Sequence, residues 1–393
     1  MRNEPWILPE GIDEVLPPHA WRLESVRREL LDLYVTWGYD LVIPPFVEYL
    51  ESLLTGTGGD LDLQTFKLTD QMSGRLMGIR ADMTPQAARI DAHRLRRESP
   101  TRLCYIGTVL HTLPGALSSS RSPMQVGVEL YGHSGVESDL EVLQLMMLTL
   151  EHVGVEEVYL DLGHVGIFRG LAKQATLTAQ QESDLFDALQ RKAVPEIQKL
   201  IAGYGVDPAM ERMLTVLAEL NGEDALDRAR VELAEASEEV MSALDYLQEV
   251  AEMVAKRMPA LPIHFDLAEL RGYHYKTGVV FAAFAPGLGE ELARGGRYDG
   301  IGRIFGRERP AVGFSSDLKT LLKVRQAQGV QREAERIYAP WTDDSALRQR
   351  VDEMRRQGHV VVSALPGQTG GAAEMGCGRE LVQQGDGWVL TRV

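Results

Sequence analysis

The chain has 393 residues, of which 44% are hydrophobic and 25% charged, and its formal net charge is −16. This composition is typical of a globular protein of two or three domains, and the acidic charge disfavours nucleic-acid binding, because phosphate contacts need a basic surface. Two cysteines, no apolar leader and no apolar run of membrane-spanning length predict a cytoplasmic protein without disulfides that binds neither nucleic acid nor membrane.

The first 170 residues predict two helices and four strands. Apolar residues at three- and four-residue steps predict an amphipathic helix over 20–37. The segment LVIPPF (41–46) is expected to be a short apolar strand, and its two prolines favour a sheet edge or an interface. Strands are expected at 102–110 and 124–132, with an almost uncharged loop between them. Ser138 and Glu141 have the spacing of a capping box before an apolar helix that ends at Gly154, and 157–168 is predicted as a strand.

Residues 170–258 predict a helical insertion without a strand. Thr178 with Gln181 fits a capping box, and Asp207 before Pro208 fits an N-cap with proline at the first helical position. Strands return within 262–270, 278–284 and 295–306, and a helix is expected over 317–328. These strand clusters lack regular βαβ alternation and therefore favour an α+β fold with an antiparallel sheet.

The last residues, 336–393, predict a small α/β unit that follows a polar break. Its expected elements are a strand, a helix (343–357), a second strand (359–364), a glycine-rich turn and a final hairpin. The turn PGQTGG lacks the lysine and spacing of a phosphate-binding loop. The chain also lacks paired-histidine metal motifs and a G-x-S-x-G nucleophile elbow, so generic catalytic motifs give an enzyme little support.

Polar residues inside the apolar strands are the remaining functional signal. Gln125 and Glu129 lie four residues apart, so strand alternation places both on one face, opposite Val126 and Val128. Spacing alone favours a solvated outer face for this pair over a binding site by about two to one. Elsewhere, Arg80, Asp82 and Thr84 share a face if GIRADMTP is extended. Taken singly, each such group fits a turn or an ion pair equally well.

Taken together, these segments resemble histidyl-tRNA synthetase over roughly residues 5–325. The segments that carry the likeness, in order, are IPPFVEYLES, GIRADMTPQAAR, LCYIGTVLHTLPG with QVGVELYG, LRGYHYKTGVVF, GGRYDG and PAVGFSSDLKTLL. The resemblance implies a class II aminoacyl-tRNA synthetase-like fold over 1–325. In that fold an antiparallel sheet is flanked by helices, 170–258 is an insertion, and a homodimer forms through the segment that contains IPPF.

The resemblance also implies a histidine-binding pocket. Asp82, Thr84 and Gln125 match the positions that hold the α-ammonium group, and an ammonium needs several acceptors. Glu129 matches the residue that faces the imidazole, with Tyr298 nearby, and Arg271 would bind the carboxylate in a bidentate manner. The full expected set is Asp82, Thr84, Gln125, Glu129, Arg271, Tyr275 and Tyr298. Asp82 is one methylene shorter than the family's glutamate, while His274 replaces an aspartate and Lys276 a pocket tyrosine.

The ATP-binding half of the synthetase site is expected to be lost. In the hairpin, His111 and Leu113 stand at the positions of a synthetase arginine and glutamate. Ser119 stands at the position of another arginine, and only Arg121 remains in the loop. In the third motif, Thr320 replaces the arginine for the γ-phosphate, and Lys319 replaces a glutamate. Adenylation needs such cations, and the loss of one donor typically costs ~10²–10³-fold in rate. The sequence therefore predicts a protein that is not an enzyme and has neither cofactor nor metal.

One family related to the synthetases keeps the amino-acid pocket but lacks the ATP-binding residues and has a shorter C-terminal domain. It is the family of regulatory subunits of ATP phosphoribosyltransferase. The resemblance implies a homodimer within a hetero-oligomer, a short-form catalytic subunit as partner in the first step of histidine biosynthesis, and L-histidine as feedback effector. Two alternatives stay open, a diverged ligase that still adenylates an amino acid and a scaffold with a vestigial pocket.

Overall fold

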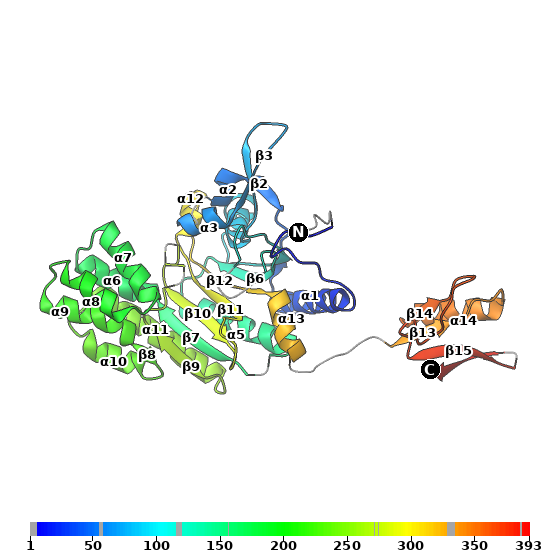
Figure 1. Cartoon of the computed structure of the whole chain (residues 1–393). Helices are drawn as coiled ribbons and strands as arrows, with labels where there is room; N and C mark the ends of the chain where they lie inside the picture. Colours follow the sequence, from blue (N-terminus) through cyan, green and yellow to red (C-terminus); the bar gives the residue numbers. More distant parts are fainter. Residues whose placement is uncertain are drawn as a thin grey trace. The chain divides into compact units, whose positions relative to one another are not determined.

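The structure is a computed structural model, which describes residues 6–54, 58–114, 120–155, 157–270, 272–273, 275–327, 335–385 and 387–393. The chain forms two compact units, 1–328 and 329–393 (Figure 1). In the described part of the chain, no helix is both long and apolar enough to cross a membrane.

A nine-stranded sheet forms the centre of the larger unit. Its strands in spatial order are β1 (Asp40–Leu41), β5 (Thr101–Thr108), β6 (Met124–Tyr131), β12 (Ala311–Asp317), β11 (Ala293–Arg297), β10 (Val279–Phe284), β7 (Tyr159–His164), β9 (Ile263–Asp266) and β8 (Asn221–Gly222). Pairing is antiparallel from β5 through β7, whereas β1 with β5 and β7 with β9 are parallel. The expected antiparallel sheet is thus confirmed at its centre, and its margins make it a mixed sheet.

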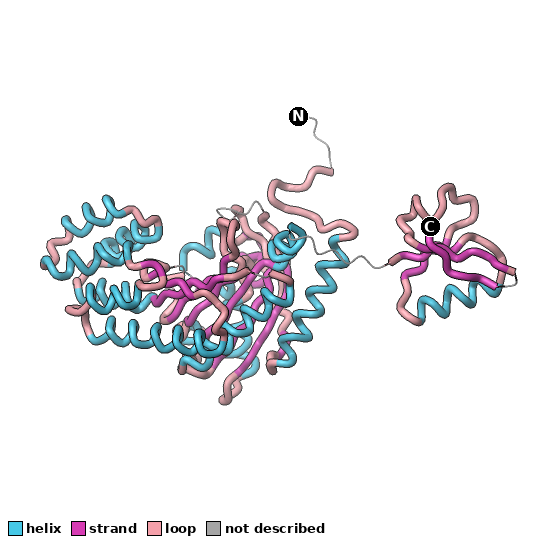
Figure 2. Tube along the Cα trace, turned by 90° about the horizontal axis from the view of Figure 1, so that it is seen from below, coloured by secondary structure: helices cyan, strands magenta, loops and turns pink. Residues whose placement is uncertain are grey.

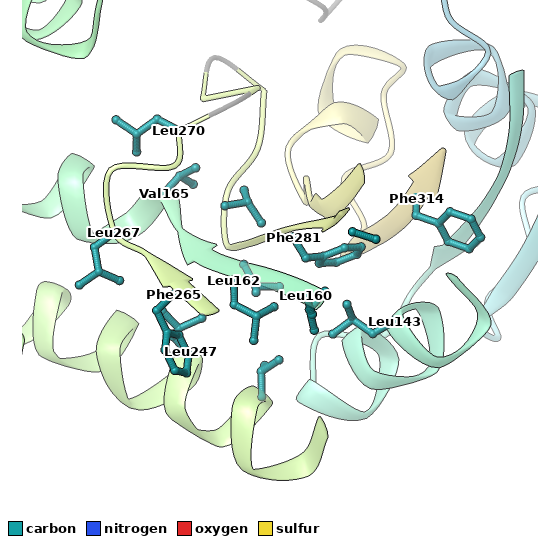
Figure 3. Packing of buried hydrophobic residues seen from close by; sticks show 14 of the residues in the cluster. Leu143, Leu160, Leu162, Val165, Leu247, Phe265, Leu267, Leu270, Phe281 and Phe314 are labelled. Carbon is teal, nitrogen blue, oxygen red and sulfur yellow. The ribbon is translucent and has the colours of Figure 1, made fainter. Parts of the chain in front are cut away.

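The main hydrophobic core lies on the face of the sheet that four helices of the larger unit cover. These helices are α1 (His19–Thr36), α5 (Val136–Val153), α11 (Glu238–Arg257) and α13 (Leu318–Ala327). Figure 3 shows Leu143 of α5 and Leu247 of α11 in this core together with Leu160 of β7. The predicted periodicity of the first helix is confirmed, because Leu23 and Leu30 are both buried against the core.

The opposite face of β5, β6 and β12 carries shorter helices. They are α4 (Thr84–Arg89), a π-helical turn (Ile90–Leu95) and α12 (Ile301–Ile304). A second core cluster joins Ala88 of α4 to Tyr131 of β6 and to Ile301 of α12. Beside it lies a three-stranded sheet in the order β2 (Val47–Tyr49), β4 (Leu76–Ile79) and β3 (Phe66–Thr69), with α2 (Leu50–Leu54) and α3 (Gly58–Gln64), none of which the sequence pattern revealed.

Helices fill most of residues 165–262, the segment between β7 and β9, which we call the insertion from here on. They are α6 (Val165–Gln174), α7 (Ala179–Gln190), α8 (Val194–Ala202), α9 (Pro208–Val216), a 3-10 turn (Leu217–Glu219), α10 (Ala225–Glu232) and α11. Figures 1 and 2 show α6 to α10 gathered beside the end of the sheet that carries β7, β9 and β8. The Thr178–Gln181 capping box and the Asp207 N-cap are both confirmed. The expectation of no strand is wrong, because Asn221–Gly222 pairs with β9.

Three other expected elements differ in their bounds. The strand expected over 41–46 is confined to Asp40–Leu41, because the two prolines that follow lack amide donors for a sheet. Helix α5 begins at Val136, ahead of the expected capping box, and the Ser138 hydroxyl donates to the Gly135 carbonyl instead, at 2.7 Å. Glu141 accepts two hydrogen bonds from the Arg102 guanidinium, each 2.7 Å. The strand expected to reach 168 ends at His164, whose side chain accepts from the Gly166 amide and caps α6.

Two later strands are also shorter than expected. The strand expected over 262–270 ends at Asp266, because its carboxylate accepts a hydrogen bond from the Ala268 amide in a tight turn. The strand expected over 295–306 runs instead from Ala293 to Arg297, and the residues that follow Gly300 form α12.

In its described residues, the smaller unit is a four-stranded sheet with one helix. Its strands in order are β14 (Val360–Ser363), β13 (Arg336–Ala339), β15 (Arg379–Gln384) and β16 (Gly387–Arg392), and its helix is α14 (Ser345–Arg356). The predicted order of strand, helix, strand and hairpin is confirmed. Asp344 caps α14 and also accepts a 2.6 Å hydrogen bond from the Trp388 indole, which ties the helix to the last strand.

Candidate functional site

Both polar residues of β6 are buried. Gln125 is 9% exposed and Glu129 is 1% exposed, so the solvated outer face that spacing alone favoured is wrong. Val126 and Val128 point to the main core on the opposite face, as strand alternation predicts. The two polar side chains therefore lie under the elements that cover the second face. Together with Asp82, Thr84, Tyr105 and Tyr298 they form a connected group, which we call the polar cluster.

One end of the polar cluster is built around Asp82. The Gln125 amide donates to the Asp82 carboxylate at 2.7 Å, and the Gln125 carbonyl oxygen accepts from the Met83 amide at 2.8 Å. The same Asp82 oxygen accepts from the Thr84 amide at 2.9 Å. The GIRADMTP segment is not extended, so the condition for a shared face is not met: β4 ends at Ile79 and α4 starts at Thr84. A turn therefore brings the carboxylate to β6.

Arg80 does not share the face of Asp82. Its guanidinium donates to the backbone carbonyls of Thr108 (2.9 Å) and Pro44 (2.8 Å), which joins the IPPF segment to the end of β5. Arg80 therefore holds these chain segments together. Of the three polar residues of GIRADMTP, only Asp82 and Thr84 belong to the polar cluster.

The other end of the polar cluster is built around Glu129. The Tyr105 hydroxyl donates to one carboxyl oxygen at 2.8 Å, the Tyr298 hydroxyl donates to the other, and Thr84 lies 3.1 Å from the Tyr105 hydroxyl. Burial raises the pKa of Glu129 to about 8, and the tyrosine hydrogen bonds oppose this rise only in part. Near neutral pH the carboxyl group is therefore mostly protonated in the absence of a cation.

Tyr105 was missed in the sequence, although strand pairing contains the signal for it. In the register of β5 and β6, Tyr105 stands opposite Gly127, which lies between Gln125 and Glu129 on the same face. A Cβ atom on Gly127 would lie 2.6 Å from the Tyr105 hydroxyl, so only glycine leaves room for the phenol. Gly313 on β12 has the same relation to Glu129, since its Cβ would lie 1.7 Å from a carboxyl oxygen.

The segment between β9 and β10 supplies further expected site residues. The Tyr275 ring lies 6.4 Å from the Tyr298 ring, centroid to centroid, and burial raises its pKa to about 12. The Lys276 ammonium is buried and donates to the Gly295 carbonyl at 2.6 Å, so it interacts with the backbone of β11. Arg271 and His274 lie outside the described residues.

Two of the positions at which ATP-binding residues are expected to be lost carry side chains that bond within the protein. The His111 imidazole interacts with the Ala81 carbonyl at 2.9 Å, and the Thr320 hydroxyl donates to the Asp317 carboxylate at 2.7 Å. Leu113 is 67% exposed. The Arg121 guanidinium donates to the carbonyls of His111 (3.0 Å) and Glu10 (2.9 Å). Ser119 lies outside the described residues.

Lys319 extends this internal bonding to the N-terminal segment. Its ammonium group donates to the Ser122 carbonyl at 2.7 Å and lies 3.3 Å from the Asp13 carboxylate. Asp13 also accepts from the Ser122 hydroxyl at 2.7 Å. Lys319, which replaces the synthetase glutamate, therefore joins α13 to the loop between β5 and β6 and to the segment that precedes α1. Among the described residues, no group of three or more His, Cys, Asp or Glu side chains could hold a metal ion.

Comparisons with known proteins match both units. The family model for histidyl-tRNA synthetase matches residues 11–321, and that for the ATP phosphoribosyltransferase subunit HisZ C-terminal domain matches residues 334–391. The ATP phosphoribosyltransferase regulatory subunit of Alkalilimnicola ehrlichii is 58% identical over 99% of this chain and 97% of its own length. That of Thioalkalivibrio sulfidiphilus is also 58% identical, over 98% of each chain.

Solved structures agree with this assignment. An ATP phosphoribosyltransferase regulatory subunit/histidyl-tRNA synthetase from Bacillus halodurans aligns with a TM-score of 0.82 at 26% identity, covering 94% of this chain and 96% of its own. The histidyl-tRNA synthetase of a Nostoc species has a TM-score of 0.78 at 18% identity, covering 96% and 91%, and shares the fold. The chain therefore belongs to the family of ATP phosphoribosyltransferase regulatory subunits.

Proposed function

We propose that the chain is a non-catalytic subunit that binds L-histidine in the polar cluster and activates a short-form ATP phosphoribosyltransferase in the first step of histidine biosynthesis. Its family membership supports the regulatory role. The observation that carries the ligand assignment is a set of acceptors in the larger unit, where the half-buried Asp82 meets the buried Gln125 and Glu129.

The chemistry of the polar cluster suits a small zwitterion with a basic ring. The Asp82 carboxylate, the Gln125 carbonyl oxygen and the Thr84 hydroxyl are acceptors for an ammonium group. Glu129 can give its proton to an imidazole and then bind the imidazolium as a carboxylate, in a dry site where such charge-assisted bonds are strong. On binding, the ligand would replace hydrogen bonds that the groups of the polar cluster now make with one another. By the resemblance, Arg271 would bind the ligand's carboxylate.

The surroundings of the cluster support a non-catalytic role. Adenylation needs cations that stabilise charge on phosphate oxygens and carboxylates that hold Mg²⁺. The side chains of His111 and Thr320 instead bond to neighbouring groups of the protein, and Arg121 is bonded to two carbonyls. Regulation then requires only that histidine bind one state of the hetero-oligomer better than another. A coupling of ~1–3 kcal/mol would change the partner's affinity for its own ligands about 5–150-fold.

We propose that the surface formed by the IPPF segment, residues 43–46, binds a second copy of the chain. Ile43 is 86% exposed and Phe46 41% exposed, and both lie in the proline-containing segment after β1. A hollow of about 460 Å³ in the same region is lined by apolar residues that include Ile43, Pro44 and Met77 and also by the charged Glu48, Arg89 and Arg94. Burial of this apolar surface in a homodimer would stabilise the assembly, which supports the arrangement that the resemblance implies.

The test is calorimetric titration of the full chain with L-histidine, with and without a short-form catalytic subunit, alongside measurement of that subunit's activity. We expect binding, activation, and inhibition by histidine that Glu129→Ala weakens while activation persists. Glu151→Ala, an exposed change on α5, is the control. Activation with no histidine binding in either mixture would leave only a scaffold, whereas histidine-dependent ATP–pyrophosphate exchange above background would establish the ligase.

A further inference from the structure

We propose that Arg169, on the first helix of the insertion, is a positioning residue that holds the loop between β9 and β10 against the polar cluster and so sets the affinity for the ligand. We call residues 267–277 the site loop. The inference rests on the proposed histidine binding and adds to it the part of the chain that controls the site. The side-chain hydrogen bonds of Arg169 go to the site loop.

The guanidinium of Arg169 spans the turn of the site loop that carries Tyr275. One terminal nitrogen, Nη2, donates to the backbone carbonyls of Tyr273 at 2.9 Å and of Lys276 at 3.0 Å. The guanidinium carbon also lies 4.8 Å from the centroid of the Tyr273 ring. Because the two carbonyls stand on either side of Tyr275, these bonds restrain the direction in which that ring projects.

Tyr273 attaches the same turn to two helices of the insertion. Its ring is 5% exposed and packs at 5.3 Å, centroid to centroid, against Phe168 of α6 and Phe186 of α7. Its hydroxyl donates to the carboxylate of Glu182, also on α7. The turn is therefore held by the Arg169 guanidinium, two aromatic contacts and a charge-assisted hydrogen bond, all from α6 and α7.

The far side of the site loop reaches the polar cluster. Tyr275 packs edge-on against Tyr298, whose hydroxyl bonds to Glu129. The Thr277 amide donates to the Arg297 carbonyl at 2.8 Å, and the Thr277 hydroxyl accepts from the Asp299 amide at 2.9 Å. The two partners of Thr277, Arg297 and Asp299, are the sequence neighbours of Tyr298. An unbroken line of contacts therefore runs from α6 through the site loop to the Glu129 end of the cluster.

A movement of α6 or α7 relative to the sheet would shift Tyr275 and Tyr298 together. By reciprocity, a ligand that draws these tyrosines inward would move the insertion helices, and a partner that binds the insertion would change histidine affinity. The insertion would then transmit the regulatory signal between the proposed ligand site and the rest of the complex.

The test uses the full chain with Arg169→Met and Arg169→Lys. The matched control is Lys173→Met, on the same helix, where the side chain is 73% exposed and pairs with Glu239. Histidine affinity is measured by calorimetry, and hydrogen–deuterium exchange of 268–277 reports on the site loop. We expect Arg169→Met to weaken binding by about 5- to 100-fold and to speed loop exchange. Arg169→Lys keeps the charge but not the planar group beside the Tyr273 ring and should give a smaller loss, with the control like wild type.

A purely structural role would lower the melting temperature and leave the affinity of the folded protein unchanged. Arg169→Met binding within twofold of wild type would therefore overturn the inference while the proposed function stands. No binding by the wild-type chain would end the proposed function and this inference with it. If Arg169→Met does not fold, Tyr273→Phe decides, because it removes only the hydroxyl that bonds to Glu182 and should still weaken binding.

Discussion

Replacement of Glu129 by glutamine should abolish most of a pH dependence in the stability of the larger unit. Burial raises the pKa of Glu129 from its ordinary value of 4.5 to about 8. Between these values the folded chain holds a proton that the unfolded chain has released, so stability falls as the pH rises through this interval. At ~1.36 kcal/mol for each pH unit, the whole loss amounts to about 5 kcal/mol.

Glutamine resembles the protonated acid in shape and in hydrogen bonding. It offers one acceptor and one donor where the carboxyl group meets the hydroxyls of Tyr105 and Tyr298, and one of those hydroxyls can turn to accept. We therefore expect Glu129→Gln to match wild type near pH 5. At pH 9 the variant should be more stable than wild type by up to about 5 kcal/mol.

The assay is urea unfolding of the full chain at pH 5, 7 and 9, followed by circular dichroism at a wavelength that reports on helix. Glu151→Gln, an exposed change on α5, is the control and should follow wild type at every pH. The reasoning would be refuted if Glu129→Gln kept the wild-type slope, or if it were the less stable protein at pH 9.

Three further substitutions test packing, charge and capping in the same urea assay. Gly313→Ala should cost about 1–3 kcal/mol, because its methyl would meet a carboxyl oxygen of the polar cluster, whereas Gly289→Ala, with no atom within 4 Å, should cost far less. Arg297→Ala should lower the free energy of unfolding by about 3–5 kcal/mol, because it removes the ion-pair partner of the buried Asp139 on α5. The exposed Arg303→Ala should cost at most about 1 kcal/mol, and equal losses at the two arginines would contradict this. Asp207→Ala should cost about 1 kcal/mol, and an unchanged midpoint would rule out the cap.

Local patterns in the sequence predicted elements whose stabilising contacts are short-range. The capping box of Thr178 and the N-cap of Asp207 depend on atoms within three residues, and both are present. The apolar spacing of the first helix and the alternation along β6 likewise identify the faces that meet the core. Ser138 and Glu141 matched the same capping pattern and failed, because a carbonyl of the loop and the Arg102 guanidinium satisfy them better.

The sequence by itself determined which face of β6 is polar, and the likeness of its motifs determined the family. Only the tertiary structure decided that this face is buried. Glu129 acquires its surroundings from Tyr105 on β5, Tyr298 after β11 and Asp82 before α4, which lie far apart along the chain. Burial and the resulting pKa depend on strand register and on the space left by Gly127 and Gly313. No pattern within one strand contains that information, because desolvation is a property of everything packed around a group.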